Sequence, residues 1–232
     1  MGFYETDRKQ EAARLRYDFS IIIEKFPIFL PAAIETLKIT SASILFGMVL
    51  GLIVSFLRLS KLKALYYPAT LYVTVIRGTP ILLQLFVVYF GLTGIVKLEA
   101  FPAAVFAFGI HNGAYISEIF RGAIKSIDPG QREAARSIGM TRFQAMKRIV
   151  LPQALKRAIP PLGNQFIIAT KDSSLASAIA VRELLLKSQQ LGSSTYHALE
   201  YFIIAGIYYL VITGVLGLLL HRVERRLAVS DR

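Results

Sequence analysis

The sequence of 232 residues contains no cysteine, which excludes disulfide bonds, thiol catalysis and cysteine-based metal sites. It also contains no G-x-x-x-x-G-K-[ST] phosphate-binding loop, so the chain cannot by itself bind and hydrolyse ATP through that motif. The first twenty residues lack the apolar run of a signal peptide, and we expect no cleavable leader. Thiol enzymes and P-loop ATPases are therefore excluded as function classes.

A plausible catalytic set is also missing. We find no nucleophile and base in a recognisable arrangement, and His111 and His197 stand alone without metal-ligand spacing around them. Single histidines more often make structural hydrogen bonds than hold a metal. We therefore expect no catalytic residue and no metal site, and a membrane enzyme is a disfavoured alternative.

Apolar residues are abundant: 54% of the sequence is hydrophobic and the mean hydropathy is +0.52. Apolar runs of about 20 residues are long enough to cross the roughly 30 Å hydrocarbon core of a bilayer as helices. The sequence therefore predicts an all-α integral membrane protein with five transmembrane helices. These spans are expected near residues 34–57, 68–92, 100–119, 158–181 and 201–220.

Positive charge is concentrated between the predicted spans. The formal net charge is +12, and the longest basic segment covers residues 121–157. In a soluble protein this charge would suggest nucleic acid, but in a membrane protein loops rich in Lys and Arg stay cytoplasmic. We therefore expect no nucleic-acid partner. Basic residues after the last span, Arg222, Arg225 and Arg226, place the C-terminus in the cytoplasm as well.

The N-terminal segment 1–31 conflicts with this topology. Five spans and a cytoplasmic C-terminus place this segment outside, although it carries several basic residues. Acidic residues interleave with them, and we interpret the segment as a charged interfacial helix that precedes a transmembrane domain over 32–232. In the alternative topology residues 158–181 do not cross, and four spans place the N-terminus inside.

Prolines and glycines mark three of the predicted spans. The segment 77–80 interrupts the second span, and its proline is expected to kink the helix. Pro160 and Pro161 are expected to break the fourth span, whose polar residues should face protein or water. In the first span, Gly47 and Gly51 have the spacing that permits close helix packing.

The basic segment contains the start and stop signals of two short helices. Asp128 suits an N-cap and Gly139 suits a left-handed C-cap. Thr141 offers a second N-cap with Gln144 three residues later, and the second helix is expected to end before Pro152. An amphipathic loop lying on the bilayer surface would show the same pattern, so these signals alone identify no partner.

This loop resembles the EAA loop of ABC-importer permeases. The matching residues, in the spacing of that family, are Glu133, Ala134, Ala135, Gly139, Ile149, Leu151 and Pro152. In the family the loop forms a coupling helix that docks in a cleft of the ATPase subunit. The segments 77–84, 115–122 and 171–175 are similar to the polar amino acid permeases, which transport histidine, glutamine, arginine and related solutes.

The resemblance implies a type I ABC importer permease fold with a cytoplasmic coupling loop at 126–152. It implies two partner ATPase subunits that bind ATP and Mg, a second permease chain that is identical or homologous, and an extracytoplasmic amino-acid-binding protein. The implied location is a bacterial inner membrane, and no cofactor is expected in this chain. An ATP-independent secondary transporter is disfavoured, because it has no ATPase on which such a loop would dock.

A polar amino acid brings charged groups into a passage of low dielectric constant, so the passage must offer polar partners. The expected substrate-pathway residues are Thr79, Asn112, Glu118, Asn164, Gln165 and Asp172. Residues expected to support the structure or form gates are Arg77, Pro80, Arg121 and Lys171.

Specific contacts are expected for some of these residues. Glu118 can pair with Arg121, three residues away on one helix face. Arg77 is expected either to pair with Glu118 or to hold a loop. Thr79, beside the Pro80 interruption, is expected to expose backbone carbonyls to a ligand. Two of the pathway candidates are acidic, which favours a cationic substrate such as arginine, lysine or histidine. Neutral or acidic amino acids such as glutamine and glutamate are the alternatives.

Overall fold

Residues 17–229 are described by the computed structural model of the protein, and all their regular structure is helical. Residues 1–16, which hold most of the charged N-terminal segment, lie outside the described residues. The elements in chain order are α2 (Ser20–Lys25), η1 (Phe26–Phe29), α3 (Leu30–Leu59), α4 (Lys63–Arg77), α5 (Ile81–Phe86), η2 (Val87–Gly91), α6 (Ala100–Lys125), α7 (Pro129–Ser137), α8 (Arg142–Ala145), η3 (Met146–Val150), α9 (Leu151–Asp172), η4 (Ser173–Ile179), α10 (Leu184–Thr195) and α11 (Ala198–Val229).

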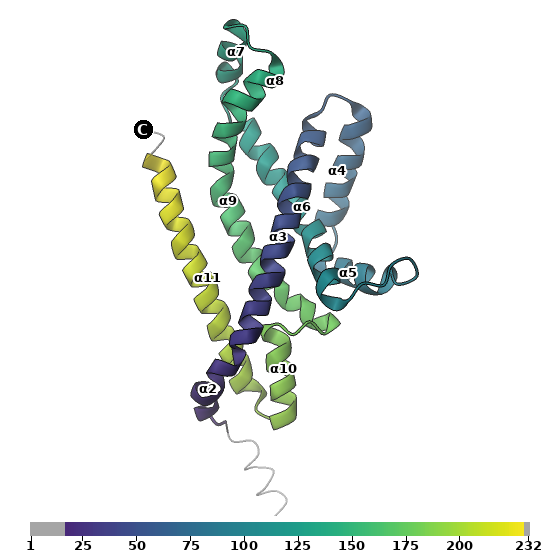
Figure 1. The fold of residues 1–232 in the computed structure, drawn as a ribbon, viewed down its shortest axis with the longest axis vertical. Helices are drawn as coiled ribbons and strands as arrows, with labels where there is room; N and C mark the ends of the chain where they lie inside the picture. Colours follow the sequence, from purple (N-terminus) through teal and green to yellow (C-terminus); the bar gives the residue numbers. More distant parts are fainter. Residues whose placement is uncertain (1–16, 230–232) are drawn as a thin grey trace, which may run out of the picture.

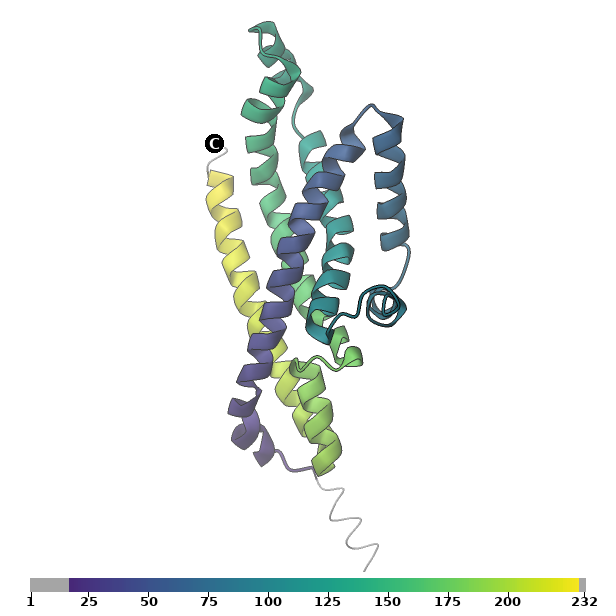
Figure 2. The same ribbon diagram turned by 45° about the vertical axis from the view of Figure 1, so that its right-hand side comes forward.

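Four long helices, α3, α6, α9 and α11, form an elongated bundle (Figure 1). Helix α4 folds back beside α3 and α6, and α5 crosses the bundle direction, so that Figure 2 shows it end-on. Helices α7 and α8 lie at one end of the bundle together with the C-terminal end of α11. Helices α2 and α10 lie at the opposite end, where the described chain begins.

Length and apolar composition identify two single spans in the described chain. They are Ser20–Leu59, which joins α2, η1 and α3, and Ala198–Leu227 in α11. Helix α4 and the α5–η2 segment qualify together as a pair bent by 108°. Helices α6 and α9 are long enough but less apolar. The helical membrane fold agrees with the sequence, whereas the number of five spans stays a prediction.

Helices α3 and α6 approach closely at two glycines of α3. A Cβ atom added at Gly47 would lie 3.1 Å from the Cβ of Asn112. One added at Gly51 would lie 2.8 Å from Cγ2 of Ile116 and 2.9 Å from the carbonyl oxygen of Gly113. At Gly51 a methyl group would force a neighbouring atom to move, and at Gly47 it would be tightly packed, which confirms the predicted close packing.

The interruption at 77–80 is a sharp turn rather than a kink. Helix α4 ends at Arg77, α5 begins at Ile81, and the two axes differ by 108°. Pro80 is extended, with φ of −63° and ψ of 136°, and precedes α5 directly. The second predicted span is therefore two helical pieces, and the interruption lies where the sequence placed it.

Two predictions based on proline are wrong. The second loop helix does not end before Pro152, because α8, the π-helical η3 and α9 are continuous. At the end of η3 the N–H of Leu151 bonds to the carbonyl of Met146, five residues back, and a π turn repositions the carbonyl that a proline ring would otherwise meet. Pro160 and Pro161 do not break α9 either. Packing of α9 against α6 and α11 outweighs the lost backbone hydrogen bonds.

Helix α10 was not predicted from the sequence. Its N-cap is Glu183, whose carboxylate accepts hydrogen bonds from the backbone N–H groups of Leu185 (2.8 Å) and Leu186 (2.7 Å). The hydroxyl of Tyr209 on α11 donates a third bond of 2.9 Å. Glu183 is fully buried, so these donors compensate for the loss of water around the carboxylate. The connection between α9 and α11 is thereby held against α11.

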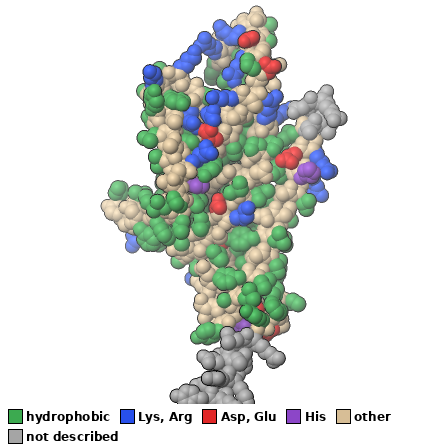
Figure 3. All heavy atoms as spheres, turned by 180° about the vertical axis from the view of Figure 1, so that it is seen from behind, with side chains coloured by type: hydrophobic (Ala, Val, Ile, Leu, Met, Phe, Trp, Pro, Cys, Tyr) green, Lys and Arg blue, Asp and Glu red, His purple; other side chains and the backbone are tan. Residues whose placement is uncertain are grey.

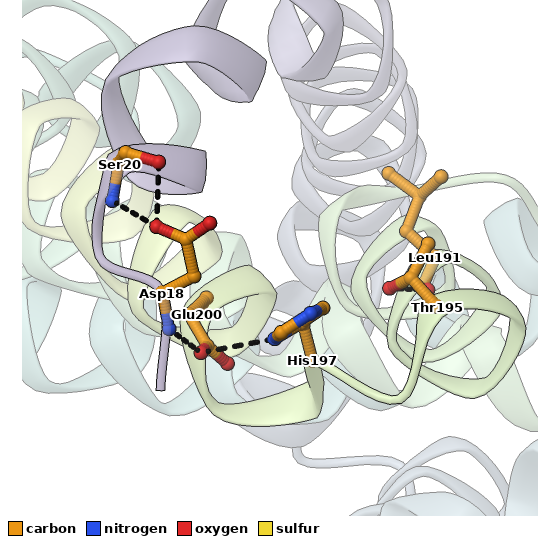
Figure 4. Close-up of polar contacts among 6 residues, drawn as sticks. All are labelled: Asp18, Ser20, Leu191, Thr195, His197 and Glu200. Atoms are coloured by element: carbon orange, nitrogen blue, oxygen red, sulfur yellow. Dashed lines mark hydrogen bonds and ion pairs between the residues drawn. The ribbon is translucent and has the colours of Figure 1, made fainter. Parts of the chain in front are cut away.

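The start of the described chain is tied to α11 by Glu200 (Figure 4). Oε1 of this buried carboxylate accepts a 2.7 Å hydrogen bond from the N–H of Asp18 and lies 3.3 Å from Nδ1 of His197. Asp18 accepts a hydrogen bond from the N–H of Ser20 at the start of α2. The described part of the predicted interfacial segment therefore packs on the bundle, and the boundary proposed at 31/32 falls within α3.

We expect Gly51→Ala to destabilise the protein by about 1–3 kcal/mol, the usual cost of adding a methyl group to a packed interior. Gly217→Ala on α11 is the matched control, since a Cβ atom there meets nothing within 4 Å. Alanine favours a helix over glycine, so the control should be neutral or slightly stabilised. The measurement is the thermal unfolding midpoint of both variants in one detergent, and equal midpoints would contradict the close contact of α3 with α6.

Candidate functional site

The predicted coupling loop folds as two short helices, α7 and α8, joined at Gly139. The carboxylate of Asp128 caps α7 by accepting a 2.8 Å hydrogen bond from the N–H of Gly130. Gly139 has a φ of +85°, the left-handed conformation that ends α7. Thr141 and Gln144 form a reciprocal capping box at the start of α8. Each predicted cap of this loop is confirmed.

The corner presents apolar side chains to solvent. Ile138 and Phe143, on either side of the corner, are 74% and 75% exposed. Glu133 and Ala134 are also exposed, whereas Ala135 is buried. Figure 3 shows Lys and Arg side chains gathered over the same end of the molecule. Exposed apolar groups rimmed by charge are typical of a surface that docks on another protein.

The loop makes direct contacts with the long helices α6 and α9. Nη2 of Arg132 on α7 donates a 3.0 Å hydrogen bond to the carbonyl of Ile124 on α6. The last motif positions, Ile149, Leu151 and Pro152, lie in η3 and in the first turn of α9, around the fully buried Val150. A force on the corner therefore acts directly on α6 and α9.

Glu118 lies between two arginines that come from different helices. Its predicted partner Arg121 donates Nη2 to Oε2 at 2.5 Å. The second partner, Arg58 at the end of α3, pairs through Nη1 with Oε1. The side chains of Arg58 and Glu118 are only 14% and 22% exposed. Arg58 was not predicted as a partner, because a basic residue directly after an apolar run is typical of the start of a cytoplasmic loop.

Arg77 does not pair with Glu118 in the described structure, so the first of its two expected roles is wrong. Its guanidinium lies over the ring of Tyr115, 5.2 Å from the ring centre, in a cation–π contact. The charges of Arg77 and Arg121 also act on Arg58. One carboxylate among these arginines gives no negative bias, so Glu118 does not support the predicted preference for a cationic substrate.

The carbonyl of Thr79 is bonded within the protein rather than exposed to a ligand. Nε2 of Gln84 donates to the carbonyls of Ile76 (2.8 Å) and Thr79 (3.1 Å) and to the Thr79 hydroxyl (2.8 Å). Oε1 of Gln84 lies 3.0 Å from Nδ1 of His111 on α6. Gln84 therefore bridges the break before α5 and links it to α6. Its position in the first turn or two after Pro80 is a signal for this role, because a long polar side chain there can reach the free carbonyls of the break.

A small cavity of about 330 Å³ adjoins this break. Its lining is mostly apolar, and the polar side chains in it are those of Thr79 and Gln84. Cavities of this size with few polar groups are typical of small-molecule sites. Thr79 is therefore next to space that a ligand can enter, although its carbonyl is already bonded.

The other pathway candidates occupy separate places. Nε2 of Gln165 donates a buried 2.9 Å hydrogen bond to Oδ1 of Asn112, which joins α9 to α6. Asn164 and Lys171 are exposed on α9, and Asp172 is half-buried at its C-terminal end. Across residues 17–229 the candidates thus form several polar contacts instead of one converging cluster, and no three His, Cys, Asp or Glu side chains there are grouped to hold a metal ion.

Comparison with known proteins gives consistent relationships over most of the chain. The family described as the binding-protein-dependent transport system inner membrane component matches residues 17–229. The arginine transport system permease protein ArtQ of Bacillus subtilis is 38% identical over 219 residues, covering 94% of this chain and 100% of ArtQ. The glutamine transport system permease protein GlnP of Escherichia coli is 38% identical over 218 residues, covering 93% and 100%.

Solved structures agree with these sequence relationships. The structure of an amino acid ABC transporter with histidines matches with a TM-score of 0.87 and 39% identity, over 91% of this chain and 100% of that chain. The inward-facing MetNI methionine ABC transporter shares the fold, with a TM-score of 0.74 at 22% identity, over 86% and 95% of the two chains.

We expect Glu118→Gln to destabilise the protein by about 3 kcal/mol, because it leaves Arg58 and Arg121 without their counter-charge at a mostly buried site. The matched control is Glu24→Gln, whose exposed pair with Lys25 should contribute nothing measurable. The measurement is thermal unfolding in detergent. Indistinguishable midpoints for the two variants would show that the arginines do not depend on Glu118.

Proposed function

The chain belongs to the family of inner membrane components of binding-protein-dependent transport systems, and we propose that it is the permease subunit of an ATP-driven importer of polar amino acids. Its working partners are two ATPase subunits that bind ATP and Mg, a second permease chain, identical or homologous, and an extracytoplasmic amino-acid-binding protein. ArtQ and GlnP, the relatives named for arginine and glutamine transport, support the substrate class.

The observation that carries this proposal is the corner between α7 and α8. A left-handed glycine turns the chain there, and Ile138 and Phe143 expose their side chains on either side. The two helices are capped at each start, and the loop is bonded to α6 through Arg132, so the corner has a fixed shape at the end of the bundle. Such a rigid apolar projection suits a cleft in a partner protein.

In the mechanism we propose, ATP closes the partner ATPase dimer and draws the coupling corners together. The coupling residues are Glu133, Ala134, Ala135, Gly139, Ile149, Leu151 and Pro152. Because α8, η3 and α9 are continuous, a displacement of the corner moves α9 directly. The transport passage opens outward in this state and returns to the inward-facing state when nucleotide leaves.

The same proposal assigns the sides of the membrane. If α7 and α8 are cytoplasmic, the C-terminal end of α11 at the same end of the bundle is cytoplasmic too (Figure 1). Helices α2 and α10 at the opposite end then face outside, as does the N-terminal segment. This assignment supports five crossings and the order of loops expected from the basic residues.

For the passage we propose the polar residues named from the sequence, with roles adjusted to their contacts. Thr79 lies at the cavity beside the α4–α5 break, and Asn112 and Gln165 form a buried pair between α6 and α9. Glu118 and Arg121 act as a structural ion pair on α6, and Arg77 acts as a structural group at the α4–α5 break. Asn164, Lys171 and Asp172 remain available to a ligand or a gate. With Glu118 neutralised, a preference for cationic amino acids depends on Asp172.

We expect the tagged chain to co-purify with a P-loop ATPase and, once reconstituted with its binding protein, to take up a labelled polar amino acid only when ATP is present inside. Arginine, glutamine and glutamate are compared in parallel to identify the preferred charge. Uptake that continues without ATP would refute the importer, and exclusive uptake of glutamate would refute only the cationic preference.

We expect Gly139→Pro to uncouple ATP hydrolysis from transport, because proline cannot adopt the φ of +85° found at this position. The variant should still insert into the membrane but bind its ATPase less well. Gly139→Asn is the control, since asparagine tolerates the left-handed conformation and a side chain there meets nothing within 4 Å. The readout is the ratio of substrate uptake to ATP hydrolysis. If both variants behave like the unchanged protein, the corner is not the coupling element.

A further inference from the structure

A second cavity lies towards the end of the bundle opposite α7 and α8. It is open to the surface, has a volume of about 520 Å³ and is bounded by the start of α3, the start of α6, the connection between η4 and α10, and α10 itself. Its lining includes two acidic and two basic side chains, Glu35, Glu99, Arg182 and Lys187. The cavity therefore carries no net charge but contains charges of both signs.

These charges do not neutralise one another. Glu99, Arg182 and Lys187 form no ion pair with any residue of the described chain. Oε2 of Glu35 accepts a 3.2 Å hydrogen bond from Nζ of Lys38, an ion pair with a residue outside the cavity lining, and its second carboxylate oxygen has no such partner in the described chain. Opposite charges that share a cavity without contact can each bind a charged group of a ligand. A ligand with a single charge would leave half of them unmatched.

The rest of the lining strengthens such contacts. Ile28, Pro31, Phe101 and Val181 supply an apolar wall. Glu35 and Lys187 are half-buried, whereas Glu99 and Arg182 are exposed at the rim. Charge–charge interactions beside an apolar wall are screened less than in open water. The volume falls within the range of small-molecule sites, so the cavity has room for a ligand the size of an amino acid.

We infer that this cavity recognises the α-ammonium and α-carboxylate groups of a free amino acid, at a site separate from the polar residues at membrane depth. Arg182 and Lys187 bind the carboxylate, and Glu35 and Glu99 bind the ammonium group. Both groups are common to all α-amino acids, so the site accepts the substrate class without selecting a side chain. The inference rests on the proposed function, because it takes the substrate to be an amino acid and this end of the bundle to face the binding protein.

The absence of cysteine makes the site accessible to a labelling experiment. Ala100→Cys places one thiol in the cavity wall, and Lys97→Cys places one on the exposed loop outside it. Each variant is purified with its ATPase, without the binding protein, and treated with an impermeant maleimide while arginine or glutamine is titrated. We expect the labelling rate at position 100 to fall about threefold at a ligand concentration of twice the dissociation constant. The rate at position 97 should not change.

Derivatives and charge variants test which groups are recognised. N-acetylglutamine lacks the ammonium group and arginine methyl ester lacks the carboxylate, so neither should protect position 100. In the Ala100→Cys background, Glu99→Gln and Arg182→Gln should remove the protection, while the charge-conserving Arg182→Lys should retain it. Equal protection by free amino acids and by these derivatives, or no protection by any of them, would overturn the inference.

Uptake by the complete complex is measured separately. Uptake without protection at position 100 overturns the cavity as an amino acid site and leaves the proposed function intact. Protection without ATP-dependent uptake by the unchanged protein retains the site and overturns the proposed importer. The two failures are therefore distinguishable.

Discussion

The contact between α3 and α6 determines where the other parts of the permease lie. Gly47 faces Asn112, and four residues later Gly51 faces Ile116, so the two helices run in the same direction in a constant register. In this register Arg58, at the end of α3, lies beside Glu118 of α6 on the side of the α7–α8 end. Between membrane helices the lipid supplies no hydrophobic attraction, and close backbone packing with polar pairing takes its place. Here both occur along one helix pair.

A second constraint applies wherever the backbone leaves the helical path. Carbonyl and N–H groups at membrane depth must find partners within the protein, because lipid offers none. Gln84 provides this at the α4–α5 break, where its amide group bonds to two carbonyls. Protein packing imposes the same requirement at the outer end of the bundle, where the buried carboxylate of Glu183 accepts from two N–H groups at the start of α10. Both of these irregular connections thus depend on one long polar side chain.

Features determined by neighbouring residues could be predicted from the sequence, whereas contacts between distant residues could not. Asp128, Gly139 and Thr141 act on backbone groups within a few residues, and their caps were predicted correctly. The ion pair of Arg58 with Glu118 joins residues far apart in the sequence, and no local sequence pattern predicts it.

The prolines of α9 illustrate the opposite case, in which a local rule is overridden. Rules for proline describe a helix whose lost hydrogen bond has no compensation. Helix α9 is instead packed against α6 and α11, and η3 adjusts the turn before Pro152. Helix α10 was missed because its N-cap is a glutamate, which is not among the preferred N-cap residues. The carboxylate is held in place by Tyr209 from another helix.

The connections around α9 also bear on how movement would spread in the proposed mechanism. A flexible loop after α8 would absorb a displacement of the coupling corner, but the helix continues through η3 into α9. Gln165 joins α9 to Asn112 of α6, and the glycine contacts join α6 to α3. These three helices are therefore expected to move as one body. The turn at Gly78 and Pro80, which is bridged by side-chain hydrogen bonds instead of a continuous helix, is then the place where a change of angle meets the least resistance.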